Sequence, residues 1–254
     1  MTWNPHTYLA FADERTRPAA ELLARIPDEA PEHVIDLGCG PGNSTALLAA
    51  RWPHARLEGL DSSPAMLEQA HRSGVTAHWI EADVATWSPK EPYDVVFSNA
   101  TLQWLGDHPA LLPRLMKAVK RGGTFAFQVP HNMDAPSHAL MRETAAQGPW
   151  AAKLANVREV AVLRPDAYYA ILKPHAQSVD IWETEYLQVL TGDDAVYHWV
   201  SGTGLRPFVQ ALSEGAERDA FIAAYKKKLS DAYPRRDGTT LFPFKRLFAV
   251  ARHS

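Results

Sequence analysis

Short apolar runs alternate with helical segments along the first half of the chain. Strands are predicted at residues 33–38, 56–61, 76–83, 93–99 and 124–130. Between them, apolar residues recur every three or four positions, as in the stripe from Leu111 to Val119 that Gly122 and Gly123 end. Such alternation is typical of parallel strands joined by crossover helices, so it predicts a doubly wound α/β sheet.

The second half is less regular. Helices are predicted at 137–147 and 164–172, a strand at 180–190, a helical stretch at about 193–233 and a last strand at 245–253. Two late strands separated by helices indicate a helical cap, at about 131–175 and 193–235, that folds over the active edge of the sheet. Because no repeat or linker is visible, residues 1–254 are expected to form a single domain. Near the N-terminus, a helix is predicted to begin close to Pro18.

Composition limits the classes of function. With 46% hydrophobic and 22% charged residues among 254, the chain fits a globular protein with one substantial core. Its formal net charge of -3 does not favour nucleic acid as a partner. The single cysteine excludes an intrachain disulfide, and neither a secretory signal nor an apolar stretch of ~18 residues is visible. We therefore expect a cytoplasmic protein that does not enter membranes.

The strongest local signal is the segment VIDLGCGPGNS at residues 34–44. A strand leads to Asp36, and the glycines at positions 38, 40 and 42 then form a tight turn into a helix. Glycine is needed where the backbone takes a positive φ or approaches a ligand without a Cβ in the way. A turn between the first strand and the first helix is also where open α/β sheets bind nucleotides.

The spacing of the glycines separates two classes of ligand. A dinucleotide site requires G-x-G-x-x-G, which seats a pyrophosphate on the helix N-terminus. This chain has G-x-G-x-G, with Asn43 in the place of the third fingerprint glycine. The turn is therefore predicted to pack against a nucleoside that carries an uncharged linkage.

Two acidic residues follow the next two strands. Asp61 ends the second strand, where a carboxylate can accept both hydroxyls of a ribose. Asp83 ends the third strand, where a carboxylate and the backbone of Val84 can bind the exocyclic amine of adenine. A helix cap is the alternative role for either acid. Together with the glycine turn, the two acids predict an adenosine site at the carboxyl edge of the sheet.

These residues, in this order, resemble the class I S-adenosylmethionine-dependent methyltransferases. The matching segments are DLGCGPG, LDSSPAML, EADV and SNATLQWL. The resemblance implies a Rossmann-like, mostly parallel seven-stranded sheet, S-adenosylmethionine as the methyl donor and S-adenosylhomocysteine as the product. It places the ribose on Asp61 and the adenine near Asp83 and Val84. It places the methionine part along Gly38, Gly40 and the end of the fourth strand around Asn99. The predicted donor-binding residues are Asp36, Gly38, Gly40, Asn43, Asp61, Ser62, Met66, Asp83, Val84, Asn99, Ala100 and Trp104, with Tyr8 and Arg15 from the N-terminal segment.

A closer resemblance extends over nearly the whole chain. The N-terminal WNPHTYLAFADERTRPAAELL and the late HWVSGTGLRPF are similar to the family of trans-aconitate methyltransferases. The resemblance implies transfer of a methyl group to one carboxylate of a small tricarboxylate, trans-aconitate, giving a monomethyl ester.

This chemistry asks for little proton transfer. A carboxylic acid with a pKa near ~4 is already ionised at neutral pH, so the nucleophile arrives without a general base. Attack of a carboxylate on a sulfonium neutralises both charges, and removal of water therefore favours the transition state. Alignment of the oxygen with the methyl carbon supplies up to ~7–11 kcal/mol. We expect orientation and desolvation to drive the reaction, with no catalytic acid or base.

A tricarboxylate still needs cationic or donor partners, and arginine matches carboxylate geometry best. Arg206, which follows a turn bracketed by glycines, is the first candidate. The predicted substrate-binding residues are Gln103, His131, Asn132, Trp199, Thr203 and Arg206. The alternatives are a surface position for Arg206, a core position for Trp199 and an ordinary loop position for His131. The N-terminal segment with Tyr8 and Arg15 is predicted either to close over the donor as a lid or to pack on the outer helices.

Other functions stay open on the sequence alone. Another small carboxylic acid, or a phenolic or quinone acceptor, fits the same donor site, and a phenol would require a base such as His131. A nicotinamide-dependent reductase is disfavoured by the missing third glycine, and a binding protein without turnover would keep the same pocket. No histidine–carboxylate cluster has metal-ligand spacing, so no metal is predicted. The oligomeric state is left open.

Overall fold

The computed structural model describes residues 12–157, 160 and 162–254, with side chains from residue 16 onward. These residues form two compact units. Unit 1 contains residues 12–130, 162–184 and 246–254. Unit 2 contains the described residues of 131–160 and residues 185–245. Helix α8 (Pro165–Leu172), which the sequence analysis included in the cap, belongs to unit 1.

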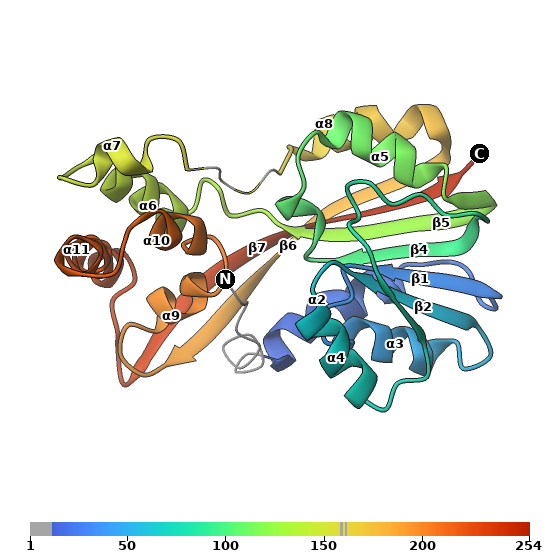
Figure 1. Cartoon of the computed structure of the whole chain (residues 1–254), viewed down its shortest axis with the longest axis horizontal. Coiled ribbons are helices and arrows are strands. Elements are labelled where there is room, and N and C mark those ends of the chain that lie inside the picture. The colour runs from blue at the N-terminus through green and yellow to red at the C-terminus, as the bar shows by residue number, and fades with distance from the viewer. Residues whose placement is uncertain (1–11, 158–159, 161) are drawn as a thin grey trace. The chain divides into compact units, whose positions relative to one another are not determined.

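The sheet has seven strands in the order β3-β2-β1-β4-β5-β7-β6 (Figure 1). The strands are β1 (His33–Leu37), β2 (Arg56–Asp61), β3 (His78–Glu81), β4 (Tyr93–Asn99), β5 (Val119–Pro130), β6 (Ala176–Thr191) and β7 (Thr239–His253). Strands β1 to β5 pair in parallel, and β7 runs antiparallel to β5. The predicted doubly wound, mostly parallel sheet is therefore confirmed. The two last strands contribute residues to both units.

Helices cover both faces of the sheet in unit 1 (Figure 1). They are α2 (Ala12–Ala24), α3 (Asn43–Arg51), α4 (Pro64–Arg72), α5 (His108–Met116) and α8, with the short 3₁₀ helices η1 (Leu102–Trp104) and η2 (Lys173–His175). Helices α2 and α3 pack together on one face, and α5 packs with α8 on the other. Between these layers Val34, Val96 and Phe125, from three adjacent strands, are completely buried. The parallel strands therefore open their carboxyl ends on one common edge.

Unit 2 is mainly helical. Its helices are α6 (Pro136–Ala146), α7 (Ala151–Leu154), α9 (Ala195–Ser201), α10 (Arg206–Ala211) and α11 (Ala216–Ala232). Helix α11 packs against α6 and α9. Its apolar stripe of Phe221, Tyr225 and Leu229 is buried, which confirms the periodicity read from the sequence. Among the described helices, none combines the length and the apolar character that crossing a membrane requires.

Two predicted helix boundaries are wrong. Helix α5 ends at Met116 instead of continuing to Gly122, because Val119 already pairs with Tyr93 as the first residue of β5. Val119 and the residues from Thr124 onward pair with β4, with a register shift between them, and this pairing outweighs the helical periodicity of the segment. At the other end of the chain, α2 holds Pro18 in its interior instead of beginning there.

The turn after β1 lies against the corner that follows β4. Gly38 has a φ of +71°, and a Cβ on it would lie 2.2 Å from the nearest atoms of the Thr101 side chain. Gly40 has a φ of +55°, but apart from Gly40 and its two chain neighbours no heavy atom of the described residues lies within 4 Å of a Cβ built on it. Packing therefore requires the first glycine, whereas the second is needed for its backbone conformation and borders open space.

Alanine substitutions separate these two requirements. Gly40→Ala is expected to lower the free energy of unfolding by about 1–2 kcal/mol, which is the strain of a left-handed alanine. Gly38→Ala adds overpacking against Thr101 of ~1–3 kcal/mol, so the total loss should be about 2–5 kcal/mol. Urea unfolding of both variants beside the unchanged protein measures the two losses. Equal losses would contradict the packing argument.

Candidate functional site

Hydrogen bonds tie the glycine turn to the end of β2. The amide of Gly38 donates to the carbonyl of Leu60 at 2.7 Å. The carboxylate of Asp61 accepts from the amide of Gly40 at 2.9 Å and from that of Ser63 at 2.8 Å. Burial raises the pKa of Asp61, and the amide bonds oppose this rise without cancelling it. These bonds orient the Asp61 carboxylate beside the turn, and its remaining lone pairs can accept from a ligand.

A buried carboxylate precedes the turn. Asp36 is 0% exposed, and its Oδ2 accepts from the hydroxyls of Ser44 and Thr45, each at 2.7 Å. Burial raises the pKa of Asp36 to about 6, the two hydroxyls lower it, and the charge of Asp61 adds a smaller rise. Its Oδ1 has no hydrogen-bond partner among the described residues. A buried carboxylate oxygen without a donor is uncommon and indicates a place for a donor group or a cation of a ligand.

The corner after β4 has an unusual backbone. Ala100 takes a φ of +54°, a left-handed value that is rare for a residue with a Cβ. Its amide donates to the carbonyl of Gln128 at 2.9 Å, and its carbonyl accepts from Nε2 of Gln103 at 2.6 Å. Oγ1 of Thr101 donates to the carbonyl of Gly38 at 3.1 Å. Backbone strain of this kind persists only where the surroundings hold it, and it often marks ligand sites.

The turn after β3 contains the second predicted acid. Asp83 lies two residues beyond Glu81, the last residue of the strand, instead of ending it. Its Oδ1 accepts from the amide of Ala85 at 2.8 Å, and the side chain is otherwise exposed. The next residue, Val84, is 5% exposed, and its carbonyl accepts from Nη2 of Arg114 at 2.6 Å. The exposed carboxylate and the buried valine follow β3 at the same edge as Asp61.

The remaining donor candidates differ in exposure. Trp104, in η1, is 45% exposed, which leaves part of its ring open to a ligand. Ser62 is exposed as well, whereas Met66 is buried in α4. Asn43 is the first residue of α3 and therefore lies at a helix N-terminus.

Two donor candidates come from the N-terminal segment. Tyr8 precedes the first described residue, and Arg15 is described only as part of the backbone of α2. Their contacts with a donor, and the action of the segment as a lid, stay predictions.

Two substrate candidates of unit 2 have roles inside that unit. Asn132 is 3% exposed, and its side-chain amide donates to the carbonyl of Lys245 at 2.7 Å while its Oδ1 accepts from the Lys245 amide at 2.8 Å. Trp199 is 1% exposed and packs on Phe242 and Phe244, with ring centroids 6.0 and 5.6 Å away. The structure thus uses Asn132 as a backbone clamp and Trp199 as a core residue. Contacts of either side chain with a substrate stay predictions.

The other substrate candidates are Arg206, Thr203, His131 and Gln103, and their surroundings differ. Arg206 is half-buried at the start of α10, and no described residue forms a hydrogen bond or an ion pair with its guanidinium. Thr203 is half-buried and uses its hydroxyl within its own turn. His131 is half-buried just after β5. Gln103, in unit 1, is 4% exposed, and its Oε1 has no partner in the described part of the chain.

The edge of the sheet formed by the carboxyl ends of β1 to β5, with the turns that follow them, is called the donor edge. Several residues that shape the donor edge were not predicted from the sequence. They are Ser44, Thr45, Thr101, Gln128 and Arg246. Gln128 and Arg246 are 0% and 5% exposed, although both side chains are polar. Gln128 interrupts the apolar run of TFAFQVP, and that interruption is the signal by which it could have been found. Arg246 stands beside Lys245 before the apolar run LFAVA and has no comparable signal.

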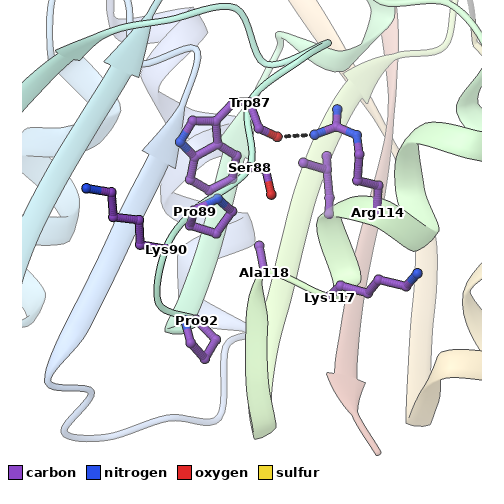
Figure 2. Close-up of a pocket in the computed structure, with 9 residues that line it drawn as sticks. Trp87, Ser88, Pro89, Lys90, Pro92, Arg114, Lys117 and Ala118 are labelled. Atoms are coloured by element: carbon purple, nitrogen blue, oxygen red, sulfur yellow. Dashed lines mark hydrogen bonds between the residues drawn. The ribbon is translucent and has the colours of Figure 1, made fainter.

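A cavity of about 240 Å³ lies at the opposite edge of the sheet (Figure 2). Two of its lining residues, Pro92 and Ala118, directly precede β4 and β5, so the cavity lies at the amino ends of these strands. Figure 2 shows the guanidinium of Arg114 bonded to the carbonyl of Trp87. This cavity is therefore separate from the donor edge. Across the described residues, no group of three or more His, Cys, Asp or Glu side chains could hold a metal ion.

Solved structures of low sequence identity share this fold. The YcgJ protein from Bacillus subtilis matches with a TM-score of 0.60 and 12% identity, over 94% of this chain and 100% of that one. A phosphoethanolamine N-methyltransferase from Haemonchus contortus matches with a TM-score of 0.56 and 17% identity, over 94% of this chain and 53% of the other. Both similarities support the fold alone.

Sequence comparisons are more specific. Residues 34–123 match the family model described as a methyltransferase domain. Trans-aconitate 2-methyltransferase from Azoarcus sp. is 52% identical, with 98% of each chain covered. The protein of the same name from Paracidovorax citrulli is 50% identical, over 99% of this chain and 98% of the relative. With such identity over nearly the full length of both relatives, the chain belongs to the trans-aconitate 2-methyltransferase family.

Proposed function

We propose that this chain transfers the methyl group of S-adenosylmethionine to a carboxylate of trans-aconitate, giving a monomethyl ester and S-adenosylhomocysteine. The observation that carries the proposal is 52% identity over 98% of the chain to a relative named for this reaction. The aligned region covers 98% of the chain and therefore nearly all of both units. Its extent supports a shared acceptor as well as a shared donor.

The donor edge fits S-adenosylmethionine. When bound, this donor supplies an electrophilic methyl group on a sulfonium, and it also carries an ammonium. The orphaned Oδ1 of Asp36 can accept from a cationic group, and the open space beside Gly40 admits a ligand close to the backbone. Asp61 would hold the ribose, Asp83 and Val84 the adenine, and the corner at Asn99 the methionine part. Trp104, Ser62, Met66, Ala100, Gly38 and Asn43 complete the proposed donor site.

The residues of the chain orient the reactants and exclude water, and none of them needs to take a proton from the acid. The carboxylate of the acceptor is ionised at neutral pH, so its oxygen forms the new C–O bond as the C–S bond of the donor breaks. The charges of the two reactants cancel in this step, so a site that removes water lowers the barrier. Arg206 is our first candidate for binding the acceptor, because its guanidinium is uncommitted among the described residues. Thr203, His131 and Gln103 are the further candidates.

A panel of acids tests the proposed reaction. The protein is incubated with donor labelled in its methyl group and with trans-aconitate, cis-aconitate, citrate, isocitrate or a simple phenol. We expect base-labile methyl ester from trans-aconitate at the highest kcat/KM, and no product from the phenol, which needs a base to lose its proton. Absence of ester from every acid would remove the proposed acceptor. Retained binding of S-adenosylhomocysteine would then show that the donor site stands.

Replacing Asp36 with asparagine should raise the free energy of unfolding and weaken donor binding. Because the folded protein raises the pKa of Asp36 from 3.8 to about 6, it binds this proton more tightly than the unfolded chain does. The contribution of Asp36 to stability therefore falls as the pH rises from about 4 to about 6, and it stays low above that range. At pH 7.5, Asp36→Asn should raise the free energy of unfolding by about 1–3 kcal/mol, an advantage that disappears below pH ~4.

Calorimetry completes this test. Asp36→Asn should raise the Kd for S-adenosylmethionine by about 10-fold or more, since a charge-assisted bond is lost. In the unchanged protein, the Kd should rise as the pH falls below about 6, whereas the variant should lack this dependence. The exposed Asp180→Asn serves as the control and should change neither quantity. A variant that is less stable and binds the donor normally would contradict the proposed role.

Two substitutions in unit 2 separate acceptor binding from proton transfer. Arg206→Ala should raise the KM for trans-aconitate by about 10- to 100-fold, and it should leave the Kd for the donor unchanged. His131→Ala should change kcat by less than about 10-fold at saturation, because the nucleophile needs no base. Arg235→Ala, which removes an exposed arginine of the same unit, is the control for lost charge. A fall in kcat of ~10⁴ for His131→Ala would establish a general base and refute the mechanism.

A further inference from the structure

Three polar side chains form a buried chain of hydrogen bonds across β7, β5 and β4. Arg246 is 5% exposed and Gln128 is 0% exposed. Nη1 of Arg246 donates to Oε1 of Gln128 at 3.0 Å. Nε2 of Gln128 donates in turn to Oδ1 of Asn99 at 2.6 Å. This hydrogen-bond chain thus leads from an arginine in unit 1 to the last residue of β4, at the donor edge.

The chemistry of arginine determines which group donates and which accepts at each step of this hydrogen-bond chain. A guanidinium only donates and stays charged, so it requires the oxygen of the Gln128 amide on its side. The nitrogen of Gln128 is thereby turned toward Asn99, which must present its own oxygen. The nitrogen of Asn99 then lies on the far side of its amide. Side-chain amides can ordinarily turn over, and here one pure donor determines the orientation of two of them.

Asn99 Nδ2 has no acceptor among the described residues, and Asn99 is half-buried. The amide lies at the strained corner with Ala100, beside the turn at Gly38 to which Thr101 bonds. Gln128 also holds this corner through its backbone, because its carbonyl accepts from the amide of Ala100 at 2.9 Å. Both the position and the orientation of the Asn99 amide are therefore determined by the neighbouring strand.

We propose that Arg246 and Gln128 are positioning residues, which present the Asn99 N–H to the α-carboxylate of the donor's methionine part. The inference rests on the proposed function, since it concerns the same donor site. The positive charge at one end polarises the two amides in series and strengthens the last N–H as a donor. Asn99 would touch the ligand, whereas Arg246 and Gln128 act only through it. A carboxylate is the acceptor that such a polarised donor binds best.

The variant Gln128→Glu reverses donor and acceptor in the hydrogen bond to Asn99, with little change in the shape of the side chain. At pH 8 the new carboxylate remains ion-paired with Arg246, but it can no longer donate to Asn99. The Asn99 amide must then turn over to donate to it, and an oxygen faces the ligand instead of an N–H. A role limited to packing would be preserved in this variant, whereas the proposed positioning role would be lost.

Two ligands make the measurement specific. S-adenosylhomocysteine carries the α-carboxylate, and 5′-methylthioadenosine has the same adenosine and thioether without it. By calorimetry, Gln128→Glu should raise the Kd for S-adenosylhomocysteine by about 10- to 100-fold and change that for 5′-methylthioadenosine less than about 2-fold. Equal weakening of both ligands, or no change in either, would overturn the proposal. If the unchanged protein binds neither ligand, the proposed function itself fails.

A second variant excludes simple charge repulsion. Asn99→Ala should weaken S-adenosylhomocysteine selectively, and addition of Gln128→Glu to it should have no further effect, because no amide remains to be turned. A further loss in the double variant would assign the effect to the new charge and overturn the proposal. Should Gln128→Glu fail to fold, normal binding by Asn99→Ala would overturn it alone. Ser98→Ala removes a buried bond from the same strand and should leave both affinities unchanged.

Discussion

The lack of space between the ends of β1 and β4 is the constraint on which the donor edge depends. A side chain at position 38 would overlap Thr101, and the hydroxyl of Thr101 bonds the carbonyl of Gly38. The corner at Ala100 is then held in a left-handed conformation by bonds to both its amide and its carbonyl. An edge arranged in this way needs little reorganisation when a ligand binds, so more of the contact energy is retained as affinity and orientation.

Asp36 and Arg246 are two of the buried charged side chains of unit 1, and the burial of each charge opposes folding. Asp36 is held by two hydroxyls that satisfy only one of its oxygens, so its charge disfavours the folded state. Arg246 bonds Gln128, and through it the orientation of Asn99 is determined. Side chains that destabilise a fold are commonly retained for function, and this supports the proposed donor site.

Family membership narrows the chemistry that the sequence left open. It removes the nicotinamide-dependent reductase, because the full-length relatives are methyltransferases. For an acceptor that is already ionised, the contribution of the protein is alignment and dehydration. Amides, hydroxyls and carboxylates arranged around a rigid turn suit that task. The substrate candidates in unit 2 fall into two groups. Asn132 and Trp199 stabilise the unit itself, whereas the guanidinium of Arg206 has no hydrogen-bond partner among the described residues.

The order of strands and helices, the glycine turn and the two acids after β2 and β3 follow from local patterns, because periodicity and spacing are properties of neighbouring residues. The sequence alone therefore determined the fold class and the kind of nucleoside, and it predicted the edge of the sheet that we propose as the binding site. The end of α5 could not be predicted from the sequence, because it depends on the pairing of Val119 with Tyr93, which lies in a distant segment. The same holds for the chain from Arg246 to Asn99, which connects three strands far apart in sequence. Only the tertiary structure could decide which buried polar groups meet, because their partners are set by strand register and not by adjacency.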